Sequence, residues 1–201
     1  MKLLLLRIAV PVALAIVSSG CSLGGLLGGG KVPPTLLTLT PQAALQGDMT
    51  RSASAGQAVT IAVPIVPKEL RSVRVPVQVS YMDVAYVEKL QWIDTPDRLF
   101  QGLLSETIRR TTGRVVLDPN QTTLDPGVTV TGHIHRFGYD AAEQAVIVRF
   151  DAALSAAGGT RVDTRRFEAK VPSSADAPNV GAALNQAANQ VALEAASWIA
   201  R

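Results

Sequence analysis

The chain of 201 residues contains a single cysteine, Cys21, so no disulfide bond within the chain supports its fold. The fold must therefore rest on a buried apolar core, and hydrophobic residues make up 47% of the sequence. If the first 20 residues are removed, 181 residues remain (201 minus 20), which predicts one domain with a substantial core.

The first 20 residues have the three parts of an export signal. Lys2 and Arg7 supply positive charge, residues 8–17 are apolar, and residues 18–20 are small. The apolar run is shorter than the roughly 20 residues that span a bilayer. We therefore expect residues 1–20 to be a signal peptide that is removed after export.

Cys21 directly follows this segment, an arrangement that resembles the lipobox of bacterial lipoproteins. The resemblance implies a diacylglyceryl group on the cysteine sulfur and an acyl chain such as palmitate on the new amine. Ser22 in the next position resembles proteins sent to the outer membrane. Residues 21–34 are rich in glycine and end in Pro33-Pro34, which predicts a flexible, lipidated tether. The alternative is an ordinary secretory signal that ends near a free thiol.

The charge balance argues against nucleic acid as a partner. Removing Lys2 and Arg7 leaves 17 basic residues (19 minus 2) and 16 acidic residues, a net charge of +1. Aromatic residues make up 4% of the chain, too few to suggest a surface for stacking bases.

Period-two alternation of apolar residues predicts most strands of the domain, which we place at residues 35–201. The expected strands cover residues 35–40, 59–65, 73–79, 83–88, 114–117, 128–137, 145–155 and 161–171. Pro76 has no amide hydrogen, so its strand should lie at an edge or carry a bulge. The pair Gly158-Gly159 should join the last two strands as a hairpin.

Two segments have the spacing of amphipathic helices. The first follows Thr95 as a cap and Pro96 as the first helical residue, and Gly113 ends it. The second begins around Pro178-Asn179 and is rich in alanine, which allows close approach to a sheet. Together the elements predict an α+β fold in two layers: a mixed, mostly antiparallel sheet with both helices packed on one face.

No reactive constellation is evident. His133 and His135 lie two residues apart on an expected strand, but no further ligand spacing accompanies them, so we expect no metal site. No nucleophile elbow or zinc-protease helix is present, which predicts no catalytic residues, no cofactor and a protein that is not an enzyme. Trp92 and Trp198 are either core side chains or contacts for a lipid or a partner.

The order of elements resembles the ABC-type transport auxiliary lipoprotein family, which includes the outer-membrane lipoprotein of the Pqi intermembrane transport system. The matching elements are residues 36–41, the set Val63, Pro67 and Leu70, Trp92 and Pro96 ahead of Leu99, the helix at 103–110, the strand ending in Phe137 and the terminal alanine-rich helix. The resemblance spans nearly the whole domain. A departure from many members is Arg71-Ser72 in the place of Asp-Arg.

The resemblance implies a non-catalytic docking component, anchored in the outer membrane and facing the periplasm. Its expected partners are a periplasmic protein with a mammalian-cell-entry (MCE) domain and an inner-membrane ABC transporter that together move lipids. The resemblance leaves open whether the protein forms a homo-oligomer. Two other functions also stay open: a lipoprotein that carries a bound lipid, and an activator of a cell-wall synthase.

Overall fold

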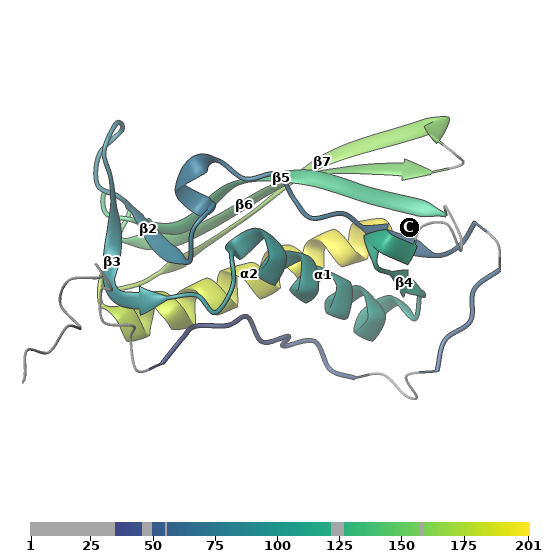
Figure 1. Ribbon diagram of the computed structural model, residues 1–201, viewed down its shortest axis with the longest axis horizontal. Helices are drawn as coiled ribbons and strands as arrows, with labels where there is room; N and C mark the ends of the chain where they lie inside the picture. Colours follow the sequence, from purple (N-terminus) through teal and green to yellow (C-terminus); the bar gives the residue numbers. More distant parts are fainter. Residues whose placement is uncertain (1–34, 46–49, 55, 122–126, 157–158) are drawn as a thin grey trace, which may run out of the picture. The chain divides into compact units, whose positions relative to one another are not determined.

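The computed structural model describes residues 35–45, 50–54, 56–121, 127–156 and 159–201 (Figure 1). Within them a seven-stranded sheet and two helices form the expected α+β fold. In chain order the elements are β1 (Val59–Ile61), η2 (Lys68–Leu70), β2 (Arg74–Gln78), β3 (Val84–Gln91), α1 (Pro96–Thr112), β4 (Val116–Leu117), η3 (Pro119–Gln121), β5 (Val128–Asp140), β6 (Ala145–Ala156), β7 (Arg161–Pro172) and α2 (Ala177–Ile199).

The long strand β5 organises the sheet. Along one edge it pairs antiparallel with β6, which pairs antiparallel with β7. Its other edge is shared: the start of β5 pairs parallel with β1, and its end pairs parallel with β2. β1 and β2 then extend the sheet to β4 and β3 respectively. The sheet is therefore mixed, and its longest pairings are antiparallel, as the sequence predicts.

Helix α1 has the boundaries that its sequence predicts. It begins at Pro96 after Thr95, whose side chain makes no capping hydrogen bond, and it ends where Gly113 takes a left-handed conformation with φ 67°. That backbone angle favours glycine, because a side chain would be strained there. The buried stripe of α1 includes Phe100 and Leu104, both fully buried in the core.

Helix α2 starts one residue before the expected Pro178-Asn179, because Asp176 caps it. The Asp176 carboxylate accepts a hydrogen bond from the backbone amide of Asn179 at 3.1 Å. Hydrogen bonds from the side chains of Asn179 and Ser174 stabilise the charged form and lower the pKa of Asp176 to about 2. The two helices lie on the same side of the sheet (Figure 1). Buried alanines on α2 let it approach β6 and β7 closely.

Aromatic side chains join the helix layer to the sheet. Phe100 of α1 lies between Phe137 of β5 and Phe150 of β6, with ring centroids 6.2 and 5.1 Å away. Trp92 meets Phe137 edge-on at 5.6 Å. Such edge-to-face pairs contribute about 0.5–1.5 kcal/mol each beyond the area that they bury. The core therefore sits between α1, α2 and the central strands.

The expected strand at residues 35–40 is not formed. Only Leu37 bridges to the sheet, beside Trp92, and the chain then crosses the helices as an extended segment. We call residues 36–45 the strap. Asn185 and Asn189 of α2 bind its backbone: Asn185 accepts from the Thr40 amide at 2.8 Å, and Asn189 accepts from the Gln42 amide at 2.7 Å. Side chains of α2 thus bind the strap where a strand would pair with the backbone of a neighbouring strand.

The expected strand at residues 59–65 is also shorter than predicted. Val59 and Ile61 are buried in β1. The backbone then changes register before Pro64, so that Pro64 is buried in place of its neighbours Val63 and Ile65. Val63 and Ile65 consequently point outward, with 43% and 57% of their surface exposed. A shift of one residue moves every following side chain to the other face of a sheet.

The remaining boundaries differ by a few residues. β3 continues to Gln91 rather than ending at 88, and β4 keeps two residues of the four expected. The irregularity predicted at Pro76 is present, since the β2–β3 register shifts between Arg74 and Pro76.

Candidate functional site

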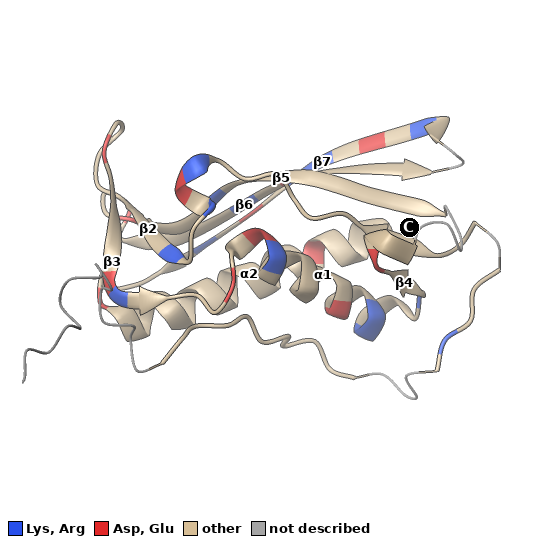
Figure 2. Ribbon diagram, viewed as in Figure 1, with Lys and Arg blue, Asp and Glu red and all other residues tan. Residues whose placement is uncertain are grey.

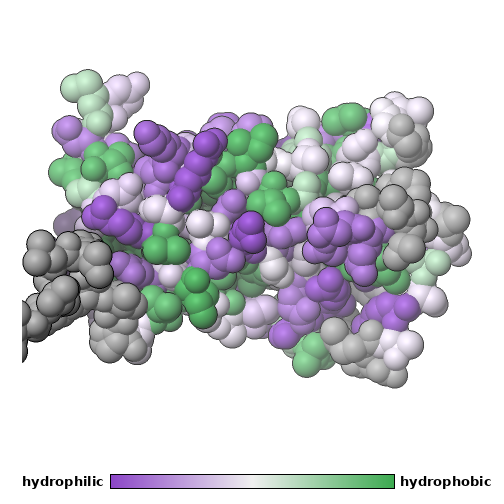
Figure 3. All heavy atoms as spheres, viewed as in Figure 1, coloured by the Kyte–Doolittle hydropathy of each residue, from purple (hydrophilic) through white to green (hydrophobic). Residues whose placement is uncertain are grey.

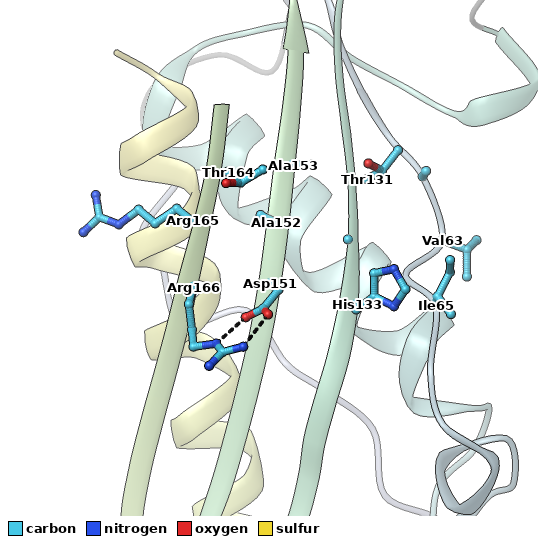
Figure 4. A pocket seen from close by; sticks show the side chains of 12 residues that line it. Val63, Ile65, Thr131, His133, Asp151, Ala152, Ala153, Thr164, Arg165 and Arg166 are labelled. Carbon is cyan, nitrogen blue, oxygen red and sulfur yellow. Dashed lines mark hydrogen bonds and ion pairs between the residues drawn. The ribbon is translucent and has the colours of Figure 1, made fainter. Parts of the chain in front are cut away.

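A groove lies on the face of the sheet opposite the helices (Figure 4). It has a volume of about 700 Å³ and crosses β7, β6 and β5 to reach the segment after β1. The side chains that shape it are Val63, Ile65, Thr131, His133, Asp151, Ala153, Thr164 and Arg166.

The two sides of the groove differ in character. Val63 and Ile65 form an apolar side, because the register change after β1 turns them outward. The residue opposite Thr131 on β6 is Ala153, whose own partner on β7 is Thr164, and these small side chains make a shallow floor. The far side is charged. A partner surface for this groove would therefore combine an apolar and a polar part.

Asp151 and Arg166 form the charged side. They are paired across β6 and β7, and two parallel hydrogen bonds of 2.6 Å each join the guanidinium to the carboxylate. These hydrogen bonds from Arg166 lower the pKa of Asp151 below its ordinary value of 3.8. At neutral pH Asp151 is thus a fixed carboxylate, an acceptor rather than a proton donor.

The two histidines share the same face, as their spacing predicts. Their rings stack with centroids 6.0 Å apart, and Nε2 of His135 lies 3.1 Å from Oδ2 of Asp151. Within the described residues, no group of three His, Cys, Asp or Glu side chains is arranged to hold a metal ion. Both histidines are exposed on the surface of the sheet.

Further ion pairs extend along the same face beyond the groove. Arg149 of β6 pairs with Glu168 of β7, and Lys170 of β7 pairs with Glu143 in the β5–β6 turn. Figure 2 shows basic and acidic segments close together along β7. Most charges of this face are neutralised by a neighbouring charge of opposite sign. The groove therefore has alternating local charges but no strong net electrostatic potential.

The two tryptophans differ in their burial. Trp92 is 1% exposed and belongs to the core, so contact with a lipid or partner would require the core to open. Trp198 is half-buried near the end of α2, where it packs against Phe167 at 5.7 Å and lines a second hollow. Cys21, the expected signal peptide at residues 1–20 and the expected tether at residues 21–34 lie outside the described residues.

A second exposed feature is the tip of the β2–β3 hairpin, which sequence reasoning missed. Tyr81 is 99% exposed and Met82 is 84% exposed. Ser80 and Asp83 brace the turn through a 2.5 Å hydrogen bond between their side chains. Figure 3 shows apolar and polar atoms side by side on this projection. Tyrosine is enriched among the residues that dominate protein interfaces, so Tyr81 is a candidate contact for a partner.

The arrangement is suited to binding. The ionised groups of the groove are engaged with one another, and its apolar side is open to a partner. No helix among the described residues is long and apolar enough to cross a membrane.

Comparison with known proteins gives two findings on structure. Protein XCC0632 from Xanthomonas campestris matches with a TM-score of 0.67 at 19% identity, over 82% of this chain and 94% of that chain. The crystal structure of an uncharacterized protein matches with a TM-score of 0.57 at 16% identity, over 83% of this chain and 98% of that one. These likenesses show the fold. No curated protein matches the chain.

Comparison with protein families gives the identity of the domain. Residues 37–196 match the family described as the ABC-type transport auxiliary lipoprotein component. The match runs from the strap to α2, over most of the 201 residues. It confirms the resemblance drawn from the order of elements. The chain belongs to the ABC-type transport auxiliary lipoprotein family.

Proposed function

We propose that this protein is a non-catalytic docking component of an intermembrane lipid transport system, anchored in the outer membrane and facing the periplasm. Its partners are a periplasmic MCE-domain protein and an inner-membrane ABC transporter. The family, an auxiliary component of ABC-type transport, supports an accessory role. The observation that carries the proposal is the groove, which offers binding surface while its charged side chains neutralise one another.

The groove is the docking surface in this proposal, and an MCE-domain protein is its occupant. A non-obligate protein interface has an apolar centre and polar groups at its rim. Val63 and Ile65 supply the apolar part, and the Asp151–Arg166 pair supplies a fixed polar edge. Arg166 keeps 61% of its side chain exposed, so it remains able to donate to a partner.

Cys21 is the anchor in this proposal. The signal-like residues 1–20 and the single cysteine behind them support lipidation at the sulfur. Several acyl chains together hold a domain on a membrane durably, because each buried methylene contributes about 0.8 kcal/mol. The glycine-rich residues 21–34 would then let the domain reach a partner in the periplasm.

The anchor and the docking surface can be tested separately in the native host. The tagged full-length protein is recovered from membranes in mild detergent, and co-purifying proteins are identified by mass spectrometry. Wild type should carry labelled palmitate and bring down MCE-domain and transporter subunits. Cys21→Ala should lose the label and appear in the soluble fraction, yet still bind a periplasmic partner.

A matched pair of substitutions tests the groove. Ile65 and Ile93 are 57% and 61% exposed, and only Ile65 lines the groove. Ile65→Glu should reduce recovery of the partner about tenfold or more, since a charge would sit in the apolar centre of the interface. Ile93→Glu should leave recovery unchanged. Equal recovery with both variants would remove the groove from the interface, and the absence of any MCE or transporter subunit with wild type would contradict the docking role.

A further inference from the structure

A second hollow lies under the far end of the sheet, on the side of the helices. Here β6 and β7 extend past the end of α2 (Figure 1). The hollow has a volume of about 580 Å³. It lies among β5, β6, β7, the loop after α1 and the last turn of α2. Its strand residues come from the same three strands as the groove, and most of them, such as Leu154 and Arg165, lie on the opposite face of the sheet.

Arginines dominate the lining of this hollow. Arg114 follows α1, Arg161 and Arg165 lie on β7, and Arg201 follows α2. Of the described lining residues only Asp163 is acidic, and it is paired with Arg161 at 2.9 Å. Within the described parts of the chain, no carboxylate pairs with Arg114 or Arg165. The hollow is therefore basic, in contrast to the groove.

The remaining lining is apolar and partly aromatic. Leu154 of β6 and Ile199 of α2 contribute aliphatic surface beside Trp198. Arg165 lies over the Phe167 ring at 5.2 Å, and Phe167 packs against Trp198 at 5.7 Å. This stack holds one guanidinium at the edge of the apolar surface. Cationic and apolar groups thus meet at one site.

We propose that this hollow binds an anionic phospholipid, with the phosphate between Arg114 and Arg165 and the start of an acyl chain against Leu154 and Trp198. Guanidinium groups bind phosphate oxygens through paired, charge-assisted hydrogen bonds. The phosphate of phosphatidylglycerol would meet two guanidinium groups that form no ion pair among the described residues, while the carboxylate of Asp163 in the same hollow is paired with Arg161. The adjacent apolar surface distinguishes an amphiphile from a soluble phosphate ester, which has no group to place there.

This site is separate from the docking surface. Arg114 and Trp198 do not line the groove. Arg165 borders the groove, but its side chain points away from it (Figure 4). Binding of lipid can therefore fail while docking succeeds, and the reverse also holds.

Trp198 provides a reporter for the test. The full chain is held in micelles of a non-ionic detergent, and its tryptophan fluorescence is followed as phosphatidylglycerol is added at increasing mole fraction. A saturable change is expected with phosphatidylglycerol. Phosphatidylcholine, whose head group carries no net charge, should produce a change only at about tenfold higher mole fraction. Soluble glycerol phosphate should not produce it in the same range.

Substitutions locate the binding. Arg114→Gln and Arg165→Gln should each raise the half-saturating mole fraction about tenfold, because each removes a charged donor to phosphate. Arg149→Gln is the matched control, since Arg149 faces the other side of the sheet and pairs with Glu168. Trp198→Phe should abolish the signal, because Trp92 is buried in the core. Unfolding curves verify that each variant is folded.

Each of the other outcomes overturns the proposal. An equal response to phosphatidylcholine would show that charge does not select the ligand. An equal response to glycerol phosphate would assign the site to a soluble phosphate ester. A response unchanged by Arg114→Gln and Arg165→Gln, or one that persists in Trp198→Phe, would place the binding elsewhere.

Discussion

The groove and the basic hollow use the same three strands in different ways. On the open face, Asp151 meets Arg166 and Arg149 meets Glu168 across β6 and β7, so opposite charges neutralise each other. On the helix side, β7 extends past the end of α2, and Arg165 has no acidic partner among the described residues. Neighbouring residues of one strand, Arg165 and Arg166, thus belong to two different surfaces, one basic and one in which the charges neutralise each other.

The difference arises from the alternation of side chains along a strand. Each residue of β7 points to the face opposite that of its neighbours. Where α2 covers the sheet, the inward positions hold Phe167 and Ala169, both buried. Beyond the helix the same series continues with Arg165, Asp163 and Arg161, which line the hollow. One strand therefore contributes both to the core and to a charged hollow, and the end of α2 marks the change.

The largest expected effect comes from disturbing the sheet that both surfaces share. A Cβ atom at Gly132 of β5 would lie 2.3 Å from the Asp151 carbonyl oxygen and 2.5 Å from the Phe150 ring. Gly132→Ala should therefore lower the free energy of unfolding by about 2 kcal/mol, as overpacking typically does. Urea unfolding measures this loss, and both surfaces should suffer together.

Gly102→Ala is the control for this substitution. Gly102 lies inside α1, and a Cβ there would meet no atom within 4 Å. The change should raise the free energy of unfolding by about 0.5–1 kcal/mol, because alanine loses less freedom in a helix. If Gly132→Ala were as stable as wild type, the close approach of β5 and β6 at this point would be wrong.

A smaller effect is expected when the groove is made to resemble the basic hollow. Asp151→Asn removes the negative charge that neutralises Arg166. In a chain that also carries Arg114→Gln and Arg165→Gln, this change should restore weak binding to phosphatidylglycerol micelles, improving it about threefold. Isothermal titration suits the measurement, since Trp198 does not line the groove. No gain in binding would indicate that pairing of charges is not what separates the two surfaces.

The smallest effect is expected from acid. The pKa of Asp151 is lowered by hydrogen bonds from Arg166, so its ionised form stabilises the fold above the ordinary pKa of 3.8. That contribution is lost as the pH falls below 3.8 through the lower pKa of the folded state. Asp176, with a pKa of about 2, acts in the same direction.

Urea midpoints measured from pH 3.8 downwards test this ordering. The midpoints should fall slightly less steeply with decreasing pH for Asp151→Asn than for wild type. Much of the pH dependence that remains in this variant should come from Asp176. A steeper fall for Asp151→Asn would reverse the predicted sign. The arginines of the basic hollow remain charged throughout this range.

Much of the fold follows from local patterns in the sequence. Thr95, Pro96 and Gly113 bound α1 as expected, and the hairpin of β6 and β7 is present. The Asp151–Arg166 pair could also have been predicted from the sequence. Asp151 lies seven residues before Gly158 (158 minus 151), and Arg166 lies seven after Gly159 (166 minus 159), so a hairpin with this turn aligns them.

Other features depend on contacts between distant segments. The strap alternates like a strand, but Asn185 and Asn189 occupy the place of a neighbouring strand, and they follow it by about 145 residues. Val63 and Ile65 alternate like core residues, and only the register change before Pro64 turns them outward. Local periodicity in the sequence cannot predict the asparagine contacts or the register change, since both are decided by tertiary packing.

The strap also gives the domain a second point of attachment near its beginning. Fraying that starts at Thr35 would have to release Leu37 from the end of β3 and then the two asparagine contacts on α2 before it could approach β1. Asn189 is itself 7% exposed, so releasing Gln42 would leave the buried side-chain oxygen of Asn189 without its donor. Load applied from the N-terminal side would thus be divided between the end of β3, which holds Leu37, and α2, which holds Thr40 and Gln42, before it reached β1.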